Sequence, residues 1–263
     1  MGVSGEAPLF SSLGKLLSII LVNQQFSGYH NKMWHRKLII ALTLCLVVAS
    51  AVLAQQQKWD ELTQQAIKLY REGKYAEATR VAEQALNLSQ KTFGPDSVEV
   101  ASSLKGLALL HMRQGKYIEA ESLLKRSLAI YEKKLGPDDS EVAETLNYLA
   151  MPYRLQGKYS EAERLHKRSL AIRERKLGPD HPEVATVLSY LAVLYDSQGK
   201  YSEAEPLYRR SLEIREKVLG PQHPDVGRSL NDLAMLYKKI GKAEEASQLE
   251  KRAKKIKSQS GSR

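Results

Sequence analysis

The sequence contains almost no cysteine: its 263 residues include one, Cys45, which lies in an apolar run. A disulfide framework is therefore excluded, and a cysteine-based metal site or nucleophile has no candidate outside that run. The alternation of polar and apolar residues that marks a strand is also missing throughout the chain. The hydrophobic content of 43% is ordinary for a globular protein, so a packed core is possible. These features together favour an all-α protein.

One short motif recurs along the chain. Gly157-Lys-Tyr-Ser-Glu-Ala162 returns every 42 residues, at Gly73, Gly115, Gly199 and, more weakly, Gly241. A Gly-Pro pair keeps the same period, at Gly94, Gly136, Gly178 and Gly220. A fixed period of this length predicts a stacked repeat array, and two breaks per period predict two elements per repeat. We expect the array to occupy residues 55–257, with repeats at about 58–96, 97–138, 139–180, 181–222 and 223–257.

Both elements of each repeat have helical spacing. In the third repeat, Val142, Leu146 and Leu149 recur three and four residues apart, which predicts a first helix, and 159–177 is the predicted second helix. Gly178 is expected to end the second helix in the left-handed conformation. The expected N-caps of the first helices are Ser97, Asp139, His181 and His223. Pro152 lies inside a first helix and predicts a kink there.

Small residues recur at three places in each hairpin, where they allow the two helices to approach closely. The first helices carry Ala66, Ala108, Ala150, Ala192 and Ala234 at one such place. The second helices carry Ala78, Ala120, Ala162, Ala204 and Ala246 at another, and Ala85, Ser127, Ser169, Ser211 and Ala253 at the third. These are expected to be the packed positions of each hairpin.

The chain before the repeats resembles an export signal. A basic start, Met33-Trp-His-Arg-Lys37, precedes an apolar run from Leu38 to Ala54 with a small residue at its end. This is the pattern of a signal peptide, while the run is also near the lower limit of roughly 17–25 residues for a membrane span. Residues 33–54 are thus a cleaved signal or an uncleaved anchor, and either places the repeats outside the cytoplasm. The third alternative is that the run is a helix of the protein core. Residues 1–32 carry no repeat, and translation starting at Met33 would make them a gene-model extension.

The repeat motif is similar to a known family. Leu146-x-x-Leu149-Ala150-x-x-Tyr153, followed by Gly157-x-Tyr159-x-x-Ala162 and Ser169, resembles the tetratricopeptide repeat. The 42-residue period and the Leu-Gly-Pro-Asp-His-Pro linker are similar to the kinesin-light-chain type. The resemblance covers about residues 58–257 and implies a right-handed superhelical solenoid of about five hairpins. A leucine replaces the family's tryptophan, and the coiled coil of a light chain is absent.

By this resemblance, the first helices line a concave groove that binds extended peptides or partner helices. The groove positions form three rows. Row one is Thr63, Lys105, Asn147, Ser189 and Asn231; row two is Ile67, Leu109, Met151, Val193 and Met235; row three is Tyr70, Met112, Arg154, Asp196 and Lys238. Asparagine can bond a peptide backbone, and methionine adapts to varied side chains. The expected partner-binding residues are Lys105, Asn147, Met151, Arg154, Ser189, Asp196, Asn231, Met235 and Lys238; the alternative is that these are ordinary solvated positions.

Other candidate sites have a structural explanation. His181 and His223 are expected to cap helices rather than bind metal, and the pairs at Glu161 and Glu203 favour a helix N-terminus. With no nucleophile, base and orienting group assembled, we expect a non-catalytic protein with no cofactor or metal.

The functional expectation is a scaffold or adaptor that binds a protein or peptide in the groove. The alternative is an accessory protein that binds a membrane or another polyanion through its basic end, which runs from Lys251 to Lys257 and continues into an expected disordered tail, 258–263. Nucleic acid is an unlikely partner, because an exported protein rarely meets it and the groove lacks aromatics in series.

Overall fold

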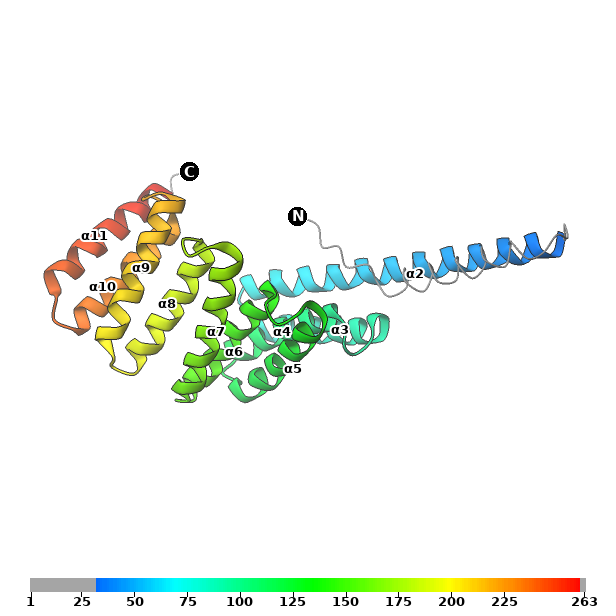
Figure 1. Cartoon of the computed structure of the whole chain (residues 1–263), viewed down its shortest axis with the longest axis horizontal. Helices are drawn as coiled ribbons and strands as arrows, with labels where there is room; N and C mark the ends of the chain where they lie inside the picture. The colour runs from blue at the N-terminus through cyan, green and yellow to red at the C-terminus, as the bar shows by residue number, and fades with distance from the viewer. Residues whose placement is uncertain (1–31, 261–263) are drawn as a thin grey trace. The chain divides into compact units, whose positions relative to one another are not determined.

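The computed structural model describes residues 32–260, and every regular element in this range is an α-helix (Figure 1). The all-α repeat architecture is therefore confirmed. The chain divides into two compact parts, Met1–Gln64 and Gln65–Arg263. The helices are α2 (Lys32–Arg71), α3 (Tyr75–Phe93), α4 (Val98–Arg113), α5 (Tyr117–Leu135), α6 (Ser140–Leu155), α7 (Tyr159–Leu177), α8 (Pro182–Ser197), α9 (Tyr201–Leu219), α10 (Pro224–Lys239) and α11 (Ala243–Ser260).

The first part is described from Lys32 onward and consists of helix, with apolar side chains exposed around it. Leu46 and Ile40 are 70% and 64% exposed. The segment Lys37–Arg71 contains a window of mean hydropathy 2.5, none of which is buried. By length and composition alone it could cross a membrane, although a signal sequence near the N-terminus would pass the same test. Apart from Lys32, the expected N-terminal extension, residues 1–32, lies outside the described residues.

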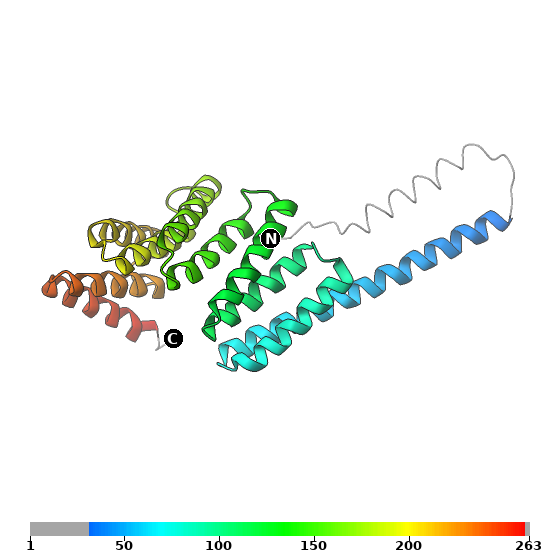
Figure 2. The same ribbon diagram turned by 90° about the horizontal axis from the view of Figure 1, so that it is seen from below.

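The second part is a stack of helical hairpins, which Figure 2 shows from below. Each of the first helices α4, α6, α8 and α10 packs on the second helix of its own hairpin and on that of the preceding one. The predicted N-caps are confirmed: Asp139 Oδ1 accepts the Glu141 amide at 2.9 Å, and His181 Nδ1 and His223 Nδ1 accept the Glu183 and Asp225 amides at 3.2 Å. One ring nitrogen of each histidine is thus engaged in capping. Helix α11 continues to Ser260 and so includes the start of the expected tail.

The glycine of the Gly-Pro linker ends each second helix in a different way from the prediction. Gly178 has φ 87° and ψ 159°, whereas the left-handed helical cap needs both angles near +50°. The positive φ is still a conformation that only glycine adopts readily. The extended ψ carries the chain directly away from the helix toward Pro179, because the next first helix starts only a few residues later.

The small residues lie where the two helices of each hairpin meet. Ala150 and Ala162 are fully buried in the third repeat, and Ser169 Oγ donates to the Ala143 carbonyl at 2.7 Å. Ser127 and Ser211 make the same bond in their own hairpins, at 2.7 and 2.8 Å. All the alanine and serine positions predicted to be packed are buried. A larger side chain at any of them would separate the helices, because interiors are close-packed.

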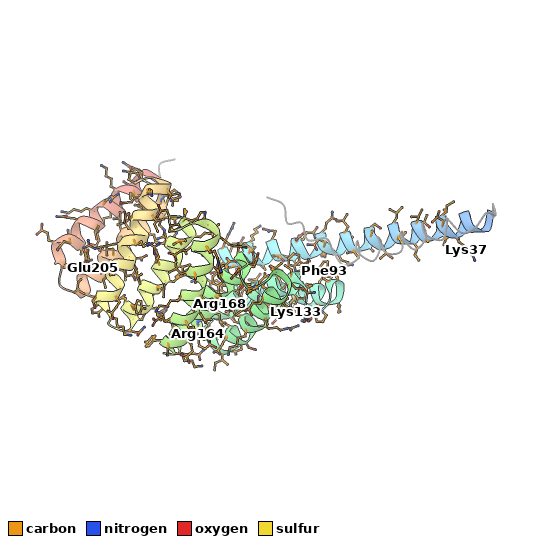
Figure 3. The ribbon with its side chains drawn as sticks, viewed as in Figure 1. Lys37, Phe93, Lys133, Arg164, Arg168 and Glu205 are labelled. Atoms are coloured by element: carbon orange, nitrogen blue, oxygen red, sulfur yellow. The ribbon has the colours of Figure 1, made fainter. Side chains whose placement is uncertain are left out.

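A ladder of ion pairs joins successive second helices in a fixed register. Arg168 pairs with Glu132 at 2.6 Å, Arg210 with Glu174 at 2.8 Å, and Arg252 with Glu216 at 2.5 Å. Figure 3 labels Arg168 on α7. Each arginine lies 42 residues after the one before, so the same contact is made at each of these junctions. Pairs this exposed are each worth about 0–1 kcal/mol, so they fix register more than stability.

Pro152 is buried inside α6, which continues through it to Leu155. The equivalent residues Leu110, Leu194 and Leu236 are also buried, at 4%, 0% and 0% exposure. We expect Pro152→Leu to raise the free energy of unfolding by up to about 3 kcal/mol, because it restores a backbone bond to the Tyr148 carbonyl. Urea unfolding measures this, with Pro206→Leu as the milder comparison on an exposed position of α9. A lower midpoint for Pro152→Leu would contradict the expectation.

Candidate binding face

The first helices form the inner side of the stack. The Cα atoms of α4 approach those of α6, and those of α6 approach α8, whereas successive second helices lie further apart. A stack whose first helices are the closer set curves toward them. We call the solvent side of α4, α6, α8 and α10 the first-helix face. The three predicted rows of residues can be placed on it one by one.

Row one is not the open polar row that the sequence predicts. Asn147 is 4% exposed, and its Oδ1 lies 3.0 Å from Nδ1 of His166 on α7. Ser189 is 8% exposed and bonds Ser211 on α9 at 2.8 Å. The expectation that Asn147 points away from the packed face is therefore wrong. The position faces the second helix, where a polar side chain in these two repeats gives it a hydrogen-bond partner.

Lys105 takes part in a partly buried ion-pair cluster rather than in an open site. Its Nζ lies 2.6 Å from Glu141 and 2.5 Å from Glu144 on α6, and 5.6 Å from the centre of the Tyr131 ring. Burial opposes its charge, but Tyr131 and the two carboxylates outweigh burial and raise the pKa of Lys105 to about 12. The cluster therefore joins α4, α5 and α6 across one repeat junction.

Rows two and three are more open, especially toward the C-terminal end. Met235 on α10 is 58% exposed, while Met151 on α6 is half-buried. Arg154 Nη1 donates to Ser197 Oγ at 3.3 Å, and Asp196 accepts Lys239 Nζ at 2.6 Å. These row-three contacts again run from one first helix to the next. Asn231 and Lys238 are exposed on α10, although Lys238 also pairs with Glu250 at 2.6 Å.

Sequence reasoning missed the buried polar side chains of the second helices. Arg215 is 5% exposed and donates to Ser189 Oγ at 3.3 Å, to Thr186 Oγ1 at 3.2 Å and to Ser229 Oγ. His166 is 2% exposed and stacks on Tyr190, with the ring centres 5.7 Å apart. Burial lowers the pKa of His166 to about 4, and the charge of Arg154 adds to this.

A signal for these residues exists in the repeat itself. The position of His166 holds Ala82, Leu124 and Tyr208 in other repeats, and that of Arg215 holds Ser89, Tyr131 and Arg173. Both positions thus vary in chemistry within an otherwise regular pattern. The fold does not need one residue type at these positions. A buried position whose residue type varies between repeats therefore gives each repeat junction its own hydrogen-bond and packing contacts.

The repeat geometry can now be compared with known proteins. A family model described as "Tetratricopeptide repeat" matches residues 62–133, 102–175, 141–217 and 198–259. The chain belongs to the tetratricopeptide repeat family. No curated protein matches the sequence.

Solved structures similar to these tetratricopeptide repeats include light-chain-like proteins. A putative kinesin light chain with nearly identical TPR-like repeats, from Podosopora anserina, is 26% identical with a TM-score of 0.63, covering 77% of this chain and 96% of that one. BtubC (BKLC) from P. vanneervenii is 23% identical with a TM-score of 0.64, covering 81% and 92%. The apo form of RapI is 16% identical with a TM-score of 0.63, covering 78% and 72%. The kinesin-light-chain-type resemblance is confirmed.

The family sets the coarse function. Tetratricopeptide repeats are generally non-catalytic scaffolds that bind protein or peptide partners, and no enzyme family matches this chain. Repeat arrays suit this role because each repeat contacts only its neighbours, which leaves a long continuous surface for a ligand.

Proposed function

We propose that this tetratricopeptide array is a scaffold that binds a peptide or protein on its first-helix face, centred on α10. The observation that supports this most is the exposure of Met235. A methionine that is 58% exposed on a folded helix provides an apolar surface that nothing in the described chain covers. The same position holds half-buried Met151 and Val193 in the preceding repeats, so the apolar row becomes most open at this end.

Polar groups beside Met235 define the kind of partner. Asn231 lies one turn before it on α10, and Lys238 follows almost one turn later. Asparagine can donate to and accept from a peptide backbone. Lys238 is 56% exposed and its pair with Glu250 is only partly buried, so an acidic group of a ligand can compete for it. The arrangement fits an extended segment with one apolar and one acidic side chain.

The double variant Asn231→Ala/Lys238→Ala tests this function. A lost hydrogen bond costs on the order of 1 kcal/mol and a charged one about 1.5–3, so partner affinity should fall roughly tenfold or more. Helix content and melting temperature should change little, because both side chains are exposed. The measurement is titration of the partner captured by the native protein.

The variant Lys251→Gln/Lys255→Gln separates the alternative function. Lys251 and Lys255 are exposed and pair with no carboxylate within the described residues, so the basic end could bind a polyanion instead. Substitution is preferable to deletion, because Ala253 and Ile256 in the same segment are buried against α10. First-helix binding should survive the two substitutions and weaken only modestly with salt. Full affinity in Asn231→Ala/Lys238→Ala, with loss in Lys251→Gln/Lys255→Gln and a steep salt dependence, would reject the first-helix face.

Location outside the cytoplasm is a second part of the proposal. It rests on Arg36 and Lys37 before the apolar run and on the exposed apolar side chains of 38–54. We expect protease added to intact cells or inverted vesicles to reach the repeats only from the non-cytoplasmic side. N-terminal sequencing of the native protein should start near Gln55 if the run is a cleaved signal, and near Met33 if it is an anchor. Soluble cytoplasmic protein that retains residues 38–54 would contradict export.

A further inference from the structure

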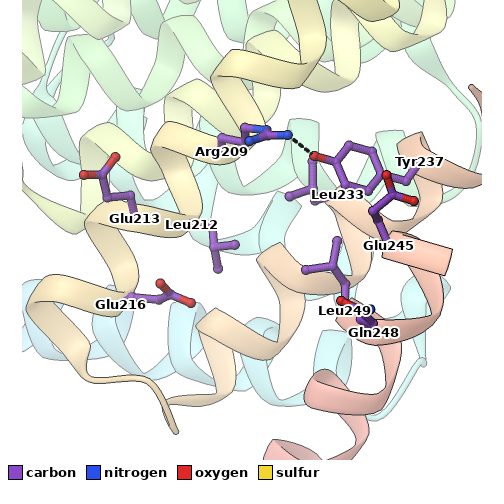
Figure 4. Close-up of a pocket in the computed structure, with 9 residues that line it drawn as sticks. All are labelled: Arg209, Leu212, Glu213, Glu216, Leu233, Tyr237, Glu245, Gln248 and Leu249. Carbon is purple, nitrogen blue, oxygen red and sulfur yellow. Dashed lines mark hydrogen bonds between the residues drawn. The ribbon is translucent and has the colours of Figure 1, made fainter. Parts of the chain in front are cut away.

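The outer side of the array contains a hollow between α9 and α11, with α10 beneath it (Figure 4). Its volume is about 450 Å³, within the roughly 300–1,000 Å³ of typical ligand pockets. The side chains of Leu212, Leu233 and Leu249 form its apolar floor. Leu233 is 3% exposed, while Leu212 and Leu249 are half-buried and leave part of their surface open.

The hollow is separate from the first-helix face. Its lining residues on α10, Leu233 and Tyr237, are buried, whereas Met235 between them is 58% exposed. On a helix with 3.6 residues per turn, a residue two positions away points to nearly the opposite side. A ligand in the hollow and a ligand on Met235 would therefore contact opposite sides of α10.

Carboxylates stand on both walls of the hollow. Glu213 projects from α9 and Glu245 from α11, and both are exposed (Figure 4). Neither forms an ion pair within the described residues. The nearby cation Arg209 is already engaged, because it bonds Glu205 at 2.7 Å and the Tyr237 hydroxyl at 2.5 Å. Glu216 is likewise paired with Arg252. The charged groups of the hollow that have no ion-pair partner in the described part of the chain are therefore both carboxylates, and a ligand in the hollow would meet negative charge.

One of the two facing carboxylates, Glu213, is a departure from the repeat, whereas Glu245 recurs as Glu77, Glu119, Glu161 and Glu203. The position of Glu213 holds Ala129 and Ala171 in the two preceding repeats, whereas the floor leucines recur as Leu170, Leu191 and Leu207. Helices α7 and α9 each pack on α8 at the equivalent junction, where Ala171 takes the place of the carboxylate. Glu213 is thus not needed for hairpin stacking, and it adds negative charge to a chain whose net charge is +10.

We propose that this hollow binds a basic amphipathic segment of a partner protein. An aliphatic side chain of the segment would cover Leu212 and Leu249, and a lysine or arginine would lie between Glu213 and Glu245. The carboxylates of the hollow favour a positively charged group. The apolar floor favours a ligand that also carries an aliphatic side chain beside that group, as a peptide does, over a metal ion or a polyamine. A scaffold with this second site could hold two partners on opposite sides of its last repeat.

The test uses full-length protein in a neutral detergent and a synthetic helical peptide made of leucine and lysine. Glu213→Gln/Glu245→Gln should weaken binding of the peptide about tenfold, which corresponds to roughly 1.4 kcal/mol. The matched control is Glu161→Gln/Glu203→Gln, which removes the same charge from exposed positions equivalent to Glu245. The control should bind the peptide like wild type, and so should Asn231→Ala/Lys238→Ala.

Three results would overturn the proposal. If Glu213→Gln/Glu245→Gln and Glu161→Gln/Glu203→Gln weaken peptide binding equally, the peptide is held by general charge attraction. If a peptide of leucine and glutamate binds as tightly as the peptide of leucine and lysine, the carboxylates of the hollow do not select a cation. Concentration-dependent dimerisation of the protein alone, abolished by Glu213→Gln/Glu245→Gln, would assign the hollow to a second copy of this chain. Because Asn231→Ala/Lys238→Ala tests the first-helix face separately, either site can fail without the other.

Discussion

Acidification from about pH 7 to pH 4 should destabilise the wild-type array by up to about 3 kcal/mol more than it destabilises His166→Leu. The pKa of His166 falls from 6.5 to about 4 in the folded protein because the ring is buried. A difference of one pKa unit corresponds to about 1.4 kcal/mol, which gives the expected size. Leucine is already accepted at this place in the hairpin, since Leu124 occupies it in the second repeat.

The sign follows from which state binds the proton. Between pH 6.5 and about 4 the unfolded chain holds the proton and the folded chain does not, so stability falls as the pH is lowered through this window. In the neutral ring, Nδ1–H donates to Asn147 Oδ1. Urea unfolding of both proteins across the window measures the difference, and an NMR titration of the His166 ring reports its pKa directly. A constant difference between the two proteins would contradict the prediction.

Arg215→Ala should open the last repeat. Arg215 joins three helices, because it donates to Thr186 and Ser189 on α8 and to Ser229 on α10 from its own position on α9. Each charged hydrogen bond is worth about 1.5–3 kcal/mol, and the buried aliphatic stem is lost as well, so we expect a cost of about 3 kcal/mol or more. In a linear array this loss is confined to one junction, and α10 and α11 should separate first.

Hydrogen exchange resolves the effect helix by helix. Amides of α10 and α11 should lose protection in Arg215→Ala, while those of α4 to α7 keep theirs. The control is Arg210→Ala on the same helix, whose side chain is 41% exposed and pairs with Glu174 on the outer side. It should cost under about 1 kcal/mol. Equal effects of the two variants, or a uniform loss of protection in all helices, would contradict the role of Arg215.

The sequence predicts well whatever repeats through local rules. The helix pairs, the caps at Asp139 and His181, and the packed positions of Ala150 and Ala162 each depend on a few neighbouring residues. These local patterns recur every 42 residues, so a helix or cap predicted in one repeat is supported by the same pattern in the others. Gly178 shows the limit even here: the residue type indicates a positive φ, but ψ depends on where the following helix must begin.

The candidate site could be predicted only in part. Asn147 and Asn231 occupy the same place in the repeat, yet one is buried and the other exposed. His166 on the second helix bonds Asn147, while the last repeat has Glu250 at the equivalent position, paired with Lys238. In addition, α8 packs beside α6, whereas no further first helix follows α10 within the described residues. Such partners are far apart in sequence and differ between repeats, so a row of equivalent positions does not show which side chains meet. The hollow beside Glu213 likewise requires the placement of three helices.

The ladder of arginine–glutamate pairs has a consequence for how the gene can change. Arg168, Arg210 and Arg252 each meet a glutamate of the preceding second helix in the same register. If residues 140–181 were removed as a block, Arg210 would meet Glu132, which is the kind of partner it already has. The buried pair of Asn147 and His166 would leave together. Unequal recombination between repeats can therefore shorten or lengthen this protein while keeping this ion-pair contact between successive second helices.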